Sequence, residues 1–287
     1  MPNYLPYLGL VCIAGVLFVF IWRKAKNKKV IPFFLCTASL IYSIEFWIFV
    51  IFKSYKYHPG VFKNEYFDSV LGASVSNGFI IPLTAVFITV YNLSFWWITL
   101  IIGCFIGVEE LFVYLGIYQH FWWKTIYTSI GMAMLFPLVK QIWPIICFRM
   151  NRLLLRFLTL FFINFAVEST LNFYFSAIFK LVFFHVDWFT DPTRGHVAFA
   201  SIYVYTDSIF FAAVVALQTR LRWKALLIGG IVIANYLLKR GGIIEFKGTL
   251  AFVLFALLQL LSLVILILMH NILLKEAAEP TAVADRY

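Results

Sequence analysis

The sequence predicts an all-α, polytopic transmembrane helical bundle, and three observations carry this prediction. Apolar residues make up 63% of the 287 residues, and only 13% are charged. The mean hydropathy is +0.92. Soluble domains have about 45–50% apolar and about 25% charged residues, so an ordinary soluble domain is excluded. The apolar residues also form runs of the roughly 20 residues that a helix needs to cross a bilayer core.

We expect about nine spans, or eight if the weakest run does not cross. The candidate runs are residues 4–22, 31–52, 69–91, 95–117, 126–148, 153–182, 197–218, 223–238 and 248–272. The run at 223–238 is the weakest, because it is short and ends in two basic residues and two glycines. It could instead form a tilted, re-entrant or interfacial helix.

Short polar connections predict that residues 1–274 form a single transmembrane domain, followed by a short, disordered cytoplasmic tail at 275–287. Basic residues accumulate in cytoplasmic loops, and the strongest basic cluster, at 23–29, follows the first run directly. This cluster predicts an amino terminus outside and a carboxyl terminus in the cytoplasm, although the basic residues at 53–63 and 239–247 oppose it. No repeat of one half of the chain in the other is visible by eye, which weakens a transporter interpretation slightly.

The net charge of +10 does not indicate nucleic acid, because the basic residues are spread over the loops beside the runs. Anionic lipid headgroups explain them, so we expect membrane lipids and no nucleic acid as partners. The segment 185–196 contains His and Asp side chains but has no known metal spacing, and the four cysteines stand singly. Phosphate-binding loops, GxSxG and HExxH are absent. We therefore predict no metal and no other cofactor.

Five carboxylates interrupt the apolar runs, and they are the best functional signal in the chain. They are Glu45, Glu109, Glu110, Glu168 and Asp207. A charged group at bilayer depth costs about 2.5–3.5 kcal/mol on insertion scales, so such residues usually face a protein interior or a wet cavity. We predict Glu168, Asp207 and Glu45 as the catalytic residues. The alternative is a purely structural role as paired groups between helices.

The run at 153–182 carries a polar stripe, with a polar residue at every fourth position: Asn164, Glu168, Asn172, Ser176 and Lys180. Positions i and i+4 share one side of a helix. Tyr203 and Asp207 have the same spacing in the next run, and Asn77 lies in the third run. We expect these polar faces to be buried together as a ligand-binding site with Asn164, Asn172, Tyr203 and Asn77. Alternatively, the amides and hydroxyls only link helices by hydrogen bonds.

Glu109 and Glu110 lie late in the fourth run, and adjacent helical residues point about 100° apart. At most one of them readily faces the same cavity, where His120 could exchange protons with it. We include Glu109, Glu110 and His120 among the candidate ligand-binding residues. The alternative places this end of the run at the outer interface, with an aromatic belt formed by Tyr118, His120, Trp122 and Trp123.

Four segments carry a resemblance to a known family. They are YHP at 57–59, IPLTA at 81–85, EELF at 109–112 and GIYQHFWWKT at 116–125. Over about residues 57–128 the chain resembles a family of small, uncharacterised multi-span integral membrane proteins of Gram-positive spore-forming bacteria. The resemblance implies a multi-pass protein of the bacterial plasma membrane and implies no catalytic role.

Three function classes remain after these observations. The first is a protein that binds or transforms a lipid-like or isoprenoid ligand by acid–base chemistry, with aromatic walls that stabilise positive charge. The second is a proton- or cation-coupled transporter that uses the same carboxylates. The third is a membrane sensor or assembly component without chemistry. We favour the first, and the sequence leaves the ligand and the oligomeric state open.

Overall fold

The computed structural model describes residues 2–275, so the predicted tail at 275–287 lies, apart from its first residue, outside the described residues. The described part contains nine helical segments that are long and apolar enough to cross a membrane. This confirms the helical, multi-span fold. The segment Leu221–Arg240 has 20 residues and is one of the nine, so the shortest predicted run also qualifies by length and composition. The orientation of the termini stays a prediction.

The chain divides into two compact units, of which unit 1 ends at Trp143 and unit 2 begins at Pro144. The single domain at 1–274 stays a prediction. Unit 1 contains α1 (Tyr4–Ala25), α2 (Val30–Glu45), η1 (Phe46–Ile51), β1 (Tyr55–Tyr57), α3 (Glu65–Ala73), η2 (Ser74–Ile80), α4 (Ile81–Val90), α5 (Phe95–Tyr114), β2 (Tyr118–His120) and α6 (Thr125–Phe148), whose last turn continues past the boundary. Here η denotes a π-helix, which is wider than an α-helix.

Unit 2 contains α7 (Leu153–Phe173), η3 (Tyr174–Ile178), β3 (Val182–Phe184), α8 (Pro192–Ala216), α9 (Leu221–Arg240), β4 (Ile244–Phe246) and α10 (Gly248–Lys275). Local sequence fixes several of these boundaries. Asn64 caps α3, because its side chain accepts a hydrogen bond of 2.9 Å from the Phe67 N–H. Asp191 caps α8 in the same way, with the Thr193 N–H as donor, and Pro192 occupies the first helical turn.

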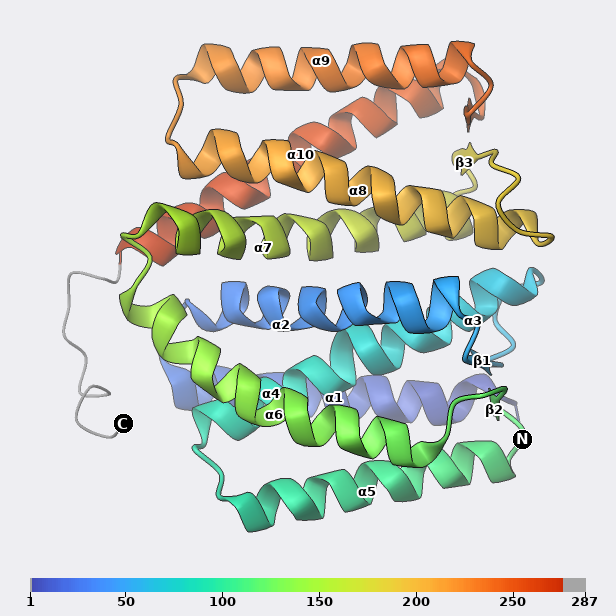
Figure 1. Cartoon of the computed structure of the whole chain (residues 1–287), viewed down its shortest axis with the longest axis vertical. Coiled ribbons are helices and arrows are strands. Elements are labelled where there is room, and N and C mark those ends of the chain that lie inside the picture. Colours follow the sequence, from blue (N-terminus) through green and yellow to red (C-terminus); the bar gives the residue numbers. More distant parts are fainter. Residues whose placement is uncertain (1, 276–287) are drawn as a thin grey trace. The chain divides into compact units, whose positions relative to one another are not determined.

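Each unit carries one short antiparallel strand pair, which the sequence analysis did not predict. In unit 1 Tyr55 pairs with His120 and Tyr57 pairs with Tyr118. Figure 1 shows β1 and β2 at the end of unit 1 where α1 begins. The Tyr7 hydroxyl on α1 donates to the Ile117 carbonyl over 2.6 Å and ties α1 to this end.

The two units repeat one order of elements, from α2 to α6 and from α7 to α10. In each unit a helix ends in a π-helix, a strand follows, two helices come next, and a second strand leads into the last helix. Backbone hydrogen bonds around the strands match as well. The matching pairs, from donor N–H to acceptor carbonyl, are His58 to Ile117 and His185 to Ile243, both 2.8 Å, and Phe121 to Ser54 at 2.9 Å and Lys247 to Leu181 at 3.0 Å.

This repeat is not visible by eye in the sequence because the two units share few residues. One shared signal is Ile-Phe-Lys, at 51–53 and again at 178–180. Both lysines, Lys53 and Lys180, have left-handed backbone angles, with φ of 48° and 52°, where the helix turns toward the strand. The order of elements repeats although no repeat is visible by eye in the sequence, so the absence of a visible repeat no longer speaks against a transporter.

The repeat contains one difference in length. The segment Glu65–Val90, formed by α3, η2 and α4, has 26 residues, whereas its counterpart α8 has 25. A π-helix accommodates an additional residue in a helix and frequently occurs at functional sites. In unit 1 this widened stretch, η2, contributes Ser76 and Asn77 to the pocket described next.

Candidate functional site

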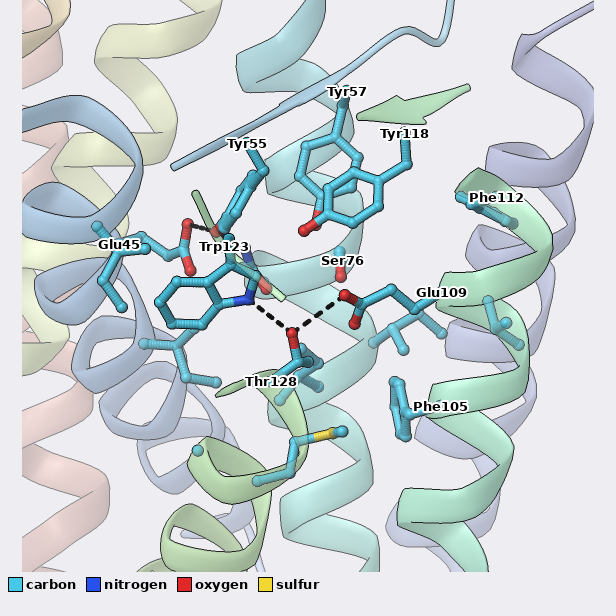
Figure 2. Close-up of a pocket in the computed structure, with 18 of the residues that line it drawn as sticks. Glu45, Tyr55, Tyr57, Ser76, Phe105, Glu109, Phe112, Tyr118, Trp123 and Thr128 are labelled. Carbon is cyan, nitrogen blue, oxygen red and sulfur yellow. Dashed lines mark hydrogen bonds between the residues drawn. The ribbon is translucent and has the colours of Figure 1, made fainter. Parts of the chain in front are cut away.

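A cavity of about 160 Å³ lies in unit 1 between the helices and the strand pair (Figure 2). A water molecule needs about 10–15 Å³ on the same measure, so the cavity has room for several waters or for part of an organic ligand. Eight aromatic side chains line it, together with aliphatic ones and two carboxylates, Glu45 and Glu109. None of the described residues that line the cavity is a lysine or an arginine.

Glu45 lies on one side of the cavity, at the last residue of α2 and directly before η1. The Tyr55 hydroxyl, presented by β1, donates a short hydrogen bond to its Oε2 atom. The Asn77 amide from η2 in turn approaches the Tyr55 oxygen at 3.5 Å, the limit of a hydrogen bond. Tyr55 and Asn77 are only 4% and 5% exposed, so this carboxylate meets polar groups held by two other elements.

Glu109 lies on the other side of the cavity, near the end of α5. Its Oε1 atom is 2.8 Å from His120 Nε2 and accepts a hydrogen bond of 3.3 Å from the Thr128 hydroxyl. Thr128 accepts a hydrogen bond of 2.8 Å from the Trp123 indole N–H. His120 retains 20% exposure of its side chain, so the network joins the buried carboxylate to a residue that is still partly open.

Two tyrosines of the strand pair extend between the carboxylates. The rings of Tyr57 and Tyr118 lie 4.6 Å apart, and Figure 2 shows both hydroxyls pointing into the space between Glu45 and Glu109. Burial is the main cause that raises the pKa of Tyr57 and of Tyr118, and nearby carboxylates add to the effect. The pKa of Tyr55 is raised for the same reasons. All three hydroxyls therefore keep their protons and can donate hydrogen bonds at neutral pH.

Backbone pairing explains this arrangement of tyrosines. Alternate residues of a strand face the same side, so Tyr55 and Tyr57 both turn inward while Lys56 turns away. Gly72 in α3 allows the strand to pack closely, because a Cβ atom there would collide with the Tyr57 side chain. The pocket thus depends on a glycine that lies one turn past the Ser69 hydroxyl, which accepts a hydrogen bond of 2.9 Å from the Tyr57 N–H.

The predicted catalytic residues Glu168 and Asp207 lie together within unit 2. Glu168 on α7 is 0% exposed and interacts electrostatically with Asp207 on α8, which is 7% exposed. Asn164 donates to the Ser208 hydroxyl over 3.1 Å, and Asn172 donates to the Glu168 backbone carbonyl over 3.0 Å. The predicted polar stripe of α7 is therefore buried from Asn164 to Ser176, while Lys180 is exposed.

Tyr203, another predicted ligand-binding residue, lies next to this cluster. Its hydroxyl donates to Asn235 Oδ1 of α9 over 2.9 Å and accepts from the Gln259 amide of α10 over 3.3 Å. The polar faces of α7 and α8 thus meet inside unit 2. The faces of α2 and of η2, with Glu45 and Asn77, meet inside unit 1 around the cavity.

The remaining predicted residues divide according to their exposure. Glu110 is exposed and accepts a hydrogen bond of 2.5 Å from the Thr125 hydroxyl, so of the two adjacent glutamates only Glu109 lines the cavity. The alternative prediction of an aromatic belt needs correction for two of its residues. Tyr118 and Trp123 line the cavity, because the strand pairing and the turn after it direct them inward, whereas Trp122 is 48% exposed.

Tyr55, Tyr57, Ser76 and Thr128 were not among the predicted site residues. Three-residue strands give little sequence signal, and the two strands of the pair are far apart in the chain. The available signal was alternation: Tyr-Lys-Tyr at 55–57 and Tyr-Gln-His at 118–120 have the period of two that a half-buried strand shows.

The segment 185–196 does not assemble a metal site in the structure. His196 Nδ1 accepts a hydrogen bond of 2.9 Å from the Phe184 N–H, Asp191 caps α8, and His185 contacts Glu245. Within residues 2–275 there is no group of three or more His, Cys, Asp and Glu side chains that could hold a metal ion.

Comparisons with protein-family models, with curated proteins and with solved structures find no match to this chain. The resemblance over residues 57–128 therefore stays a prediction.

Proposed function

We propose that this multi-pass membrane protein binds an unsaturated lipid-like ligand, such as an isoprenoid, in the unit 1 cavity and isomerises it by acid–base chemistry. The observation that carries the proposal is that two carboxyl groups, Glu45 and Glu109, lie in one cavity that is lined by eight aromatic side chains. In line with the resemblance, we place the protein in the plasma membrane of a bacterium, with membrane lipids as its surroundings and as the source of the ligand.

The lining favours an apolar ligand over a phosphorylated or sugar ligand. A phosphate group is usually recognised by Arg, Lys or several backbone N–H groups. The described lining contains no lysine or arginine, and most of its side chains are aromatic or aliphatic. Aromatic faces attract positive charge, so they suit a ligand that becomes cationic during the reaction.

The proposed step is a balanced proton transfer. The carboxyl group of Glu45 adds its proton to one carbon of a double bond and leaves a cation at the other carbon. Glu109 then removes a proton from a neighbouring carbon, and a double bond forms in a new position. The product is an isomer of the ligand, so no oxidant or second reactant is required. Glu109 gains the proton that is lost by the ligand, Glu45 loses one, and proton exchange with water restores both carboxyl groups. General acid–base catalysis of this kind contributes roughly 10²–10⁴-fold to a rate.

The polar partners of the two carboxyl groups support these roles. Tyr55 donates to Glu45 and holds that carboxyl group at the cavity wall. His120, within 2.8 Å of Glu109 and partly exposed, offers an exit for the proton that Glu109 receives. Buried hydroxyls of Tyr57 and Tyr118 stay protonated, and they line the path between the two groups without competing as bases.

The test uses the purified full-length protein in D₂O with squalene and geranylgeraniol as unsaturated probes, and squalane as the saturated control. Mass spectrometry should detect isomers that carry one deuterium with an unsaturated probe and none with squalane. Glu45→Gln should reduce deuterium incorporation at least 100-fold. The control is Glu110→Gln, which changes the exposed residue next to Glu109 and should leave deuterium incorporation unchanged.

A second measurement separates binding from chemistry. Lipids that co-purify with the wild type and with a Glu45→Gln, Glu109→Gln double variant should be compared by mass spectrometry. If an unsaturated lipid is enriched in the wild type but no deuterium is exchanged, the protein binds or senses the lipid and is not an isomerase. Identical lipid profiles together with no exchange would exclude the pocket as a ligand site.

A further inference from the structure

Unit 2 contains a second buried polar cluster, which the proposed reaction does not use. Helices α7, α8 and α10 pack against one another there. Figure 1 shows α7 and α8 side by side, with α10 crossing next to them. The cluster consists of seven side chains, each at most 7% exposed: Asn164, Glu168, Asn172, Asp207, Ser208, Gln259 and Ser262. None of the seven is basic.

Most oxygens of this cluster have no hydrogen-bond partner. Buried polar atoms in native proteins are almost always paired with protein groups or with water, so each exception needs an explanation. Here the exceptions occur on three neighbouring helices and all are oxygens. The unpaired atoms are Asn164 Oδ1, both carboxyl oxygens of Glu168, Asn172 Oδ1, Asp207 Oδ2, Gln259 Oε1 and Ser262 Oγ.

The amide groups are oriented so that their oxygens remain unpaired. The amide N–H₂ group of Asn164 donates to the Ser208 hydroxyl, and that of Asn172 donates to the Glu168 backbone carbonyl. The amide of Gln259 donates to the Tyr203 hydroxyl. Each amide donor is thus engaged while its carbonyl oxygen is unpaired. An arrangement that pairs each amide nitrogen and leaves the oxygens unpaired favours a partner with positive charge or with several donors.

Hard cations prefer such a ligand set, since carboxylate and amide oxygens are their usual ligands. The cost of dehydrating an ion rises with the square of its charge, so a monovalent ion enters a buried cluster more easily than a divalent one. A Na⁺ ion together with one proton balances the charges of the two carboxyl groups. Seven unpaired oxygens exceed what a single shared proton can satisfy.

We propose that Glu168, Asp207, the amide oxygens of Asn164 and Gln259, and the Ser262 hydroxyl bind one monovalent cation, for which Na⁺ is the probe. The site goes beyond the proposed isomerisation and does not rest on it, because all of its residues belong to unit 2.

The test measures Na⁺ binding to the purified full-length protein in detergent. Equilibrium binding of ²²Na⁺ should reach one ion per chain. Thermal unfolding in NaCl should occur at a higher temperature than in choline chloride of equal ionic strength, and the shift should grow with concentration, because a ligand that binds the native state stabilises it by mass action. Glu168→Gln should weaken Na⁺ binding at least tenfold.

The matched control is Glu245→Gln, which removes one exposed carboxylate of the same unit and should leave Na⁺ binding unchanged. If Glu168→Gln does not fold, Ser262→Ala removes one unpaired oxygen without changing the charge and should weaken binding several-fold. Absence of ²²Na⁺ binding to the wild type, equal binding by wild type and Ser262→Ala, or stabilisation by CaCl₂ but not by NaCl would each overturn the proposal.

Discussion

Units 1 and 2 use one order of helices and strands for two different interiors. In unit 1 the strand pair carries polar side chains: Tyr55, Tyr57 and Tyr118 line the cavity, and His120 contacts Glu109. In unit 2 the corresponding residues are apolar and close a core with α10: Val182, Phe184, Ile244 and Phe246. The same order of elements therefore accompanies a cavity in one unit and an apolar core in the other, and the side chains of the strand pairs differ accordingly.

The carboxylates follow the same division. Counted back from the matching lysines, Lys53 and Lys180, the residue of unit 2 that corresponds to Glu45 is Asn172. Counted back from Gly116 and Gly242, which share positive φ angles of 69° and 73°, the residue that corresponds to Glu109 is Asn235. Both pocket carboxylates thus have amide counterparts. Unit 2 instead places its acids where unit 1 has isoleucines. Glu168 corresponds to Ile41 by the count from the lysines, and Asp207 corresponds to Ile81 when counted back from Gln218 and Asn92, which share positive φ angles of 52° and 49°.

The largest effect is expected when unit 1 receives the residue of unit 2. Glu45→Asn replaces the proposed acid with the amide that unit 2 carries at the matching position. We expect deuterium incorporation into squalene to fall at least 100-fold, since an amide cannot donate a proton to a double bond. The assay is the mass spectrometry described above. Activity above one tenth of the wild type would separate Glu45 from the chemistry.

The filled core of unit 2 should be the most sensitive to truncation. Phe184 is 0% exposed and packs in the core cluster, so Phe184→Ala should lower the free energy of unfolding by about 3–5 kcal/mol. Chemical unfolding followed by circular dichroism measures this change. Trp188→Ala, a truncation at a half-exposed aromatic of the same unit, is the control and should cost less. A cost below about 1 kcal/mol for Phe184→Ala would show that this core is not tightly packed.

The close packing of the strand on α3 gives a smaller effect. Gly72→Ala places a Cβ atom against Tyr57, and overpacking of this kind should cost about 1–3 kcal/mol. The control is Gly107→Ala in α5, where no atom lies within 4 Å of the added Cβ. Unfolding of both variants in the same denaturant series checks the difference. Equal stability of the two would mean that the strand shifts without cost.

The two histidine–glutamate contacts should give the smallest effects. The side chains of His120 and Glu109 are 20% and 10% exposed, whereas those of His185 and Glu245 are 51% and 69% exposed. His120→Gln should therefore cost about 1 kcal/mol, while His185→Gln should stay within about 0.5 kcal/mol of the wild type, as surface changes usually do. Unfolding midpoints at one pH measure both. A larger cost for His185→Gln would contradict the ranking.

Sequence patterns were sufficient for the helical elements and insufficient for their pairing. Runs of apolar residues determine spans because bilayer thickness fixes their length, and the described residues contain nine helical segments of this kind. The spacing of Glu168 and Asp207 indicated buried helix faces, and the structure places these two residues together. Tyr55 and Tyr57 were missed because long-range strand pairing and one glycine, Gly72, determine their positions.

The additional residue in η2 has a consequence at the level of the gene. Each residue in a helix rotates the following side chains by about 100°, so the loss of a single codon between Ser74 and Ile80 would restore the length of α8 and turn Asn77 away from Tyr55. One in-frame deletion is thus the shortest mutational route from the cavity of unit 1 toward the interior of unit 2.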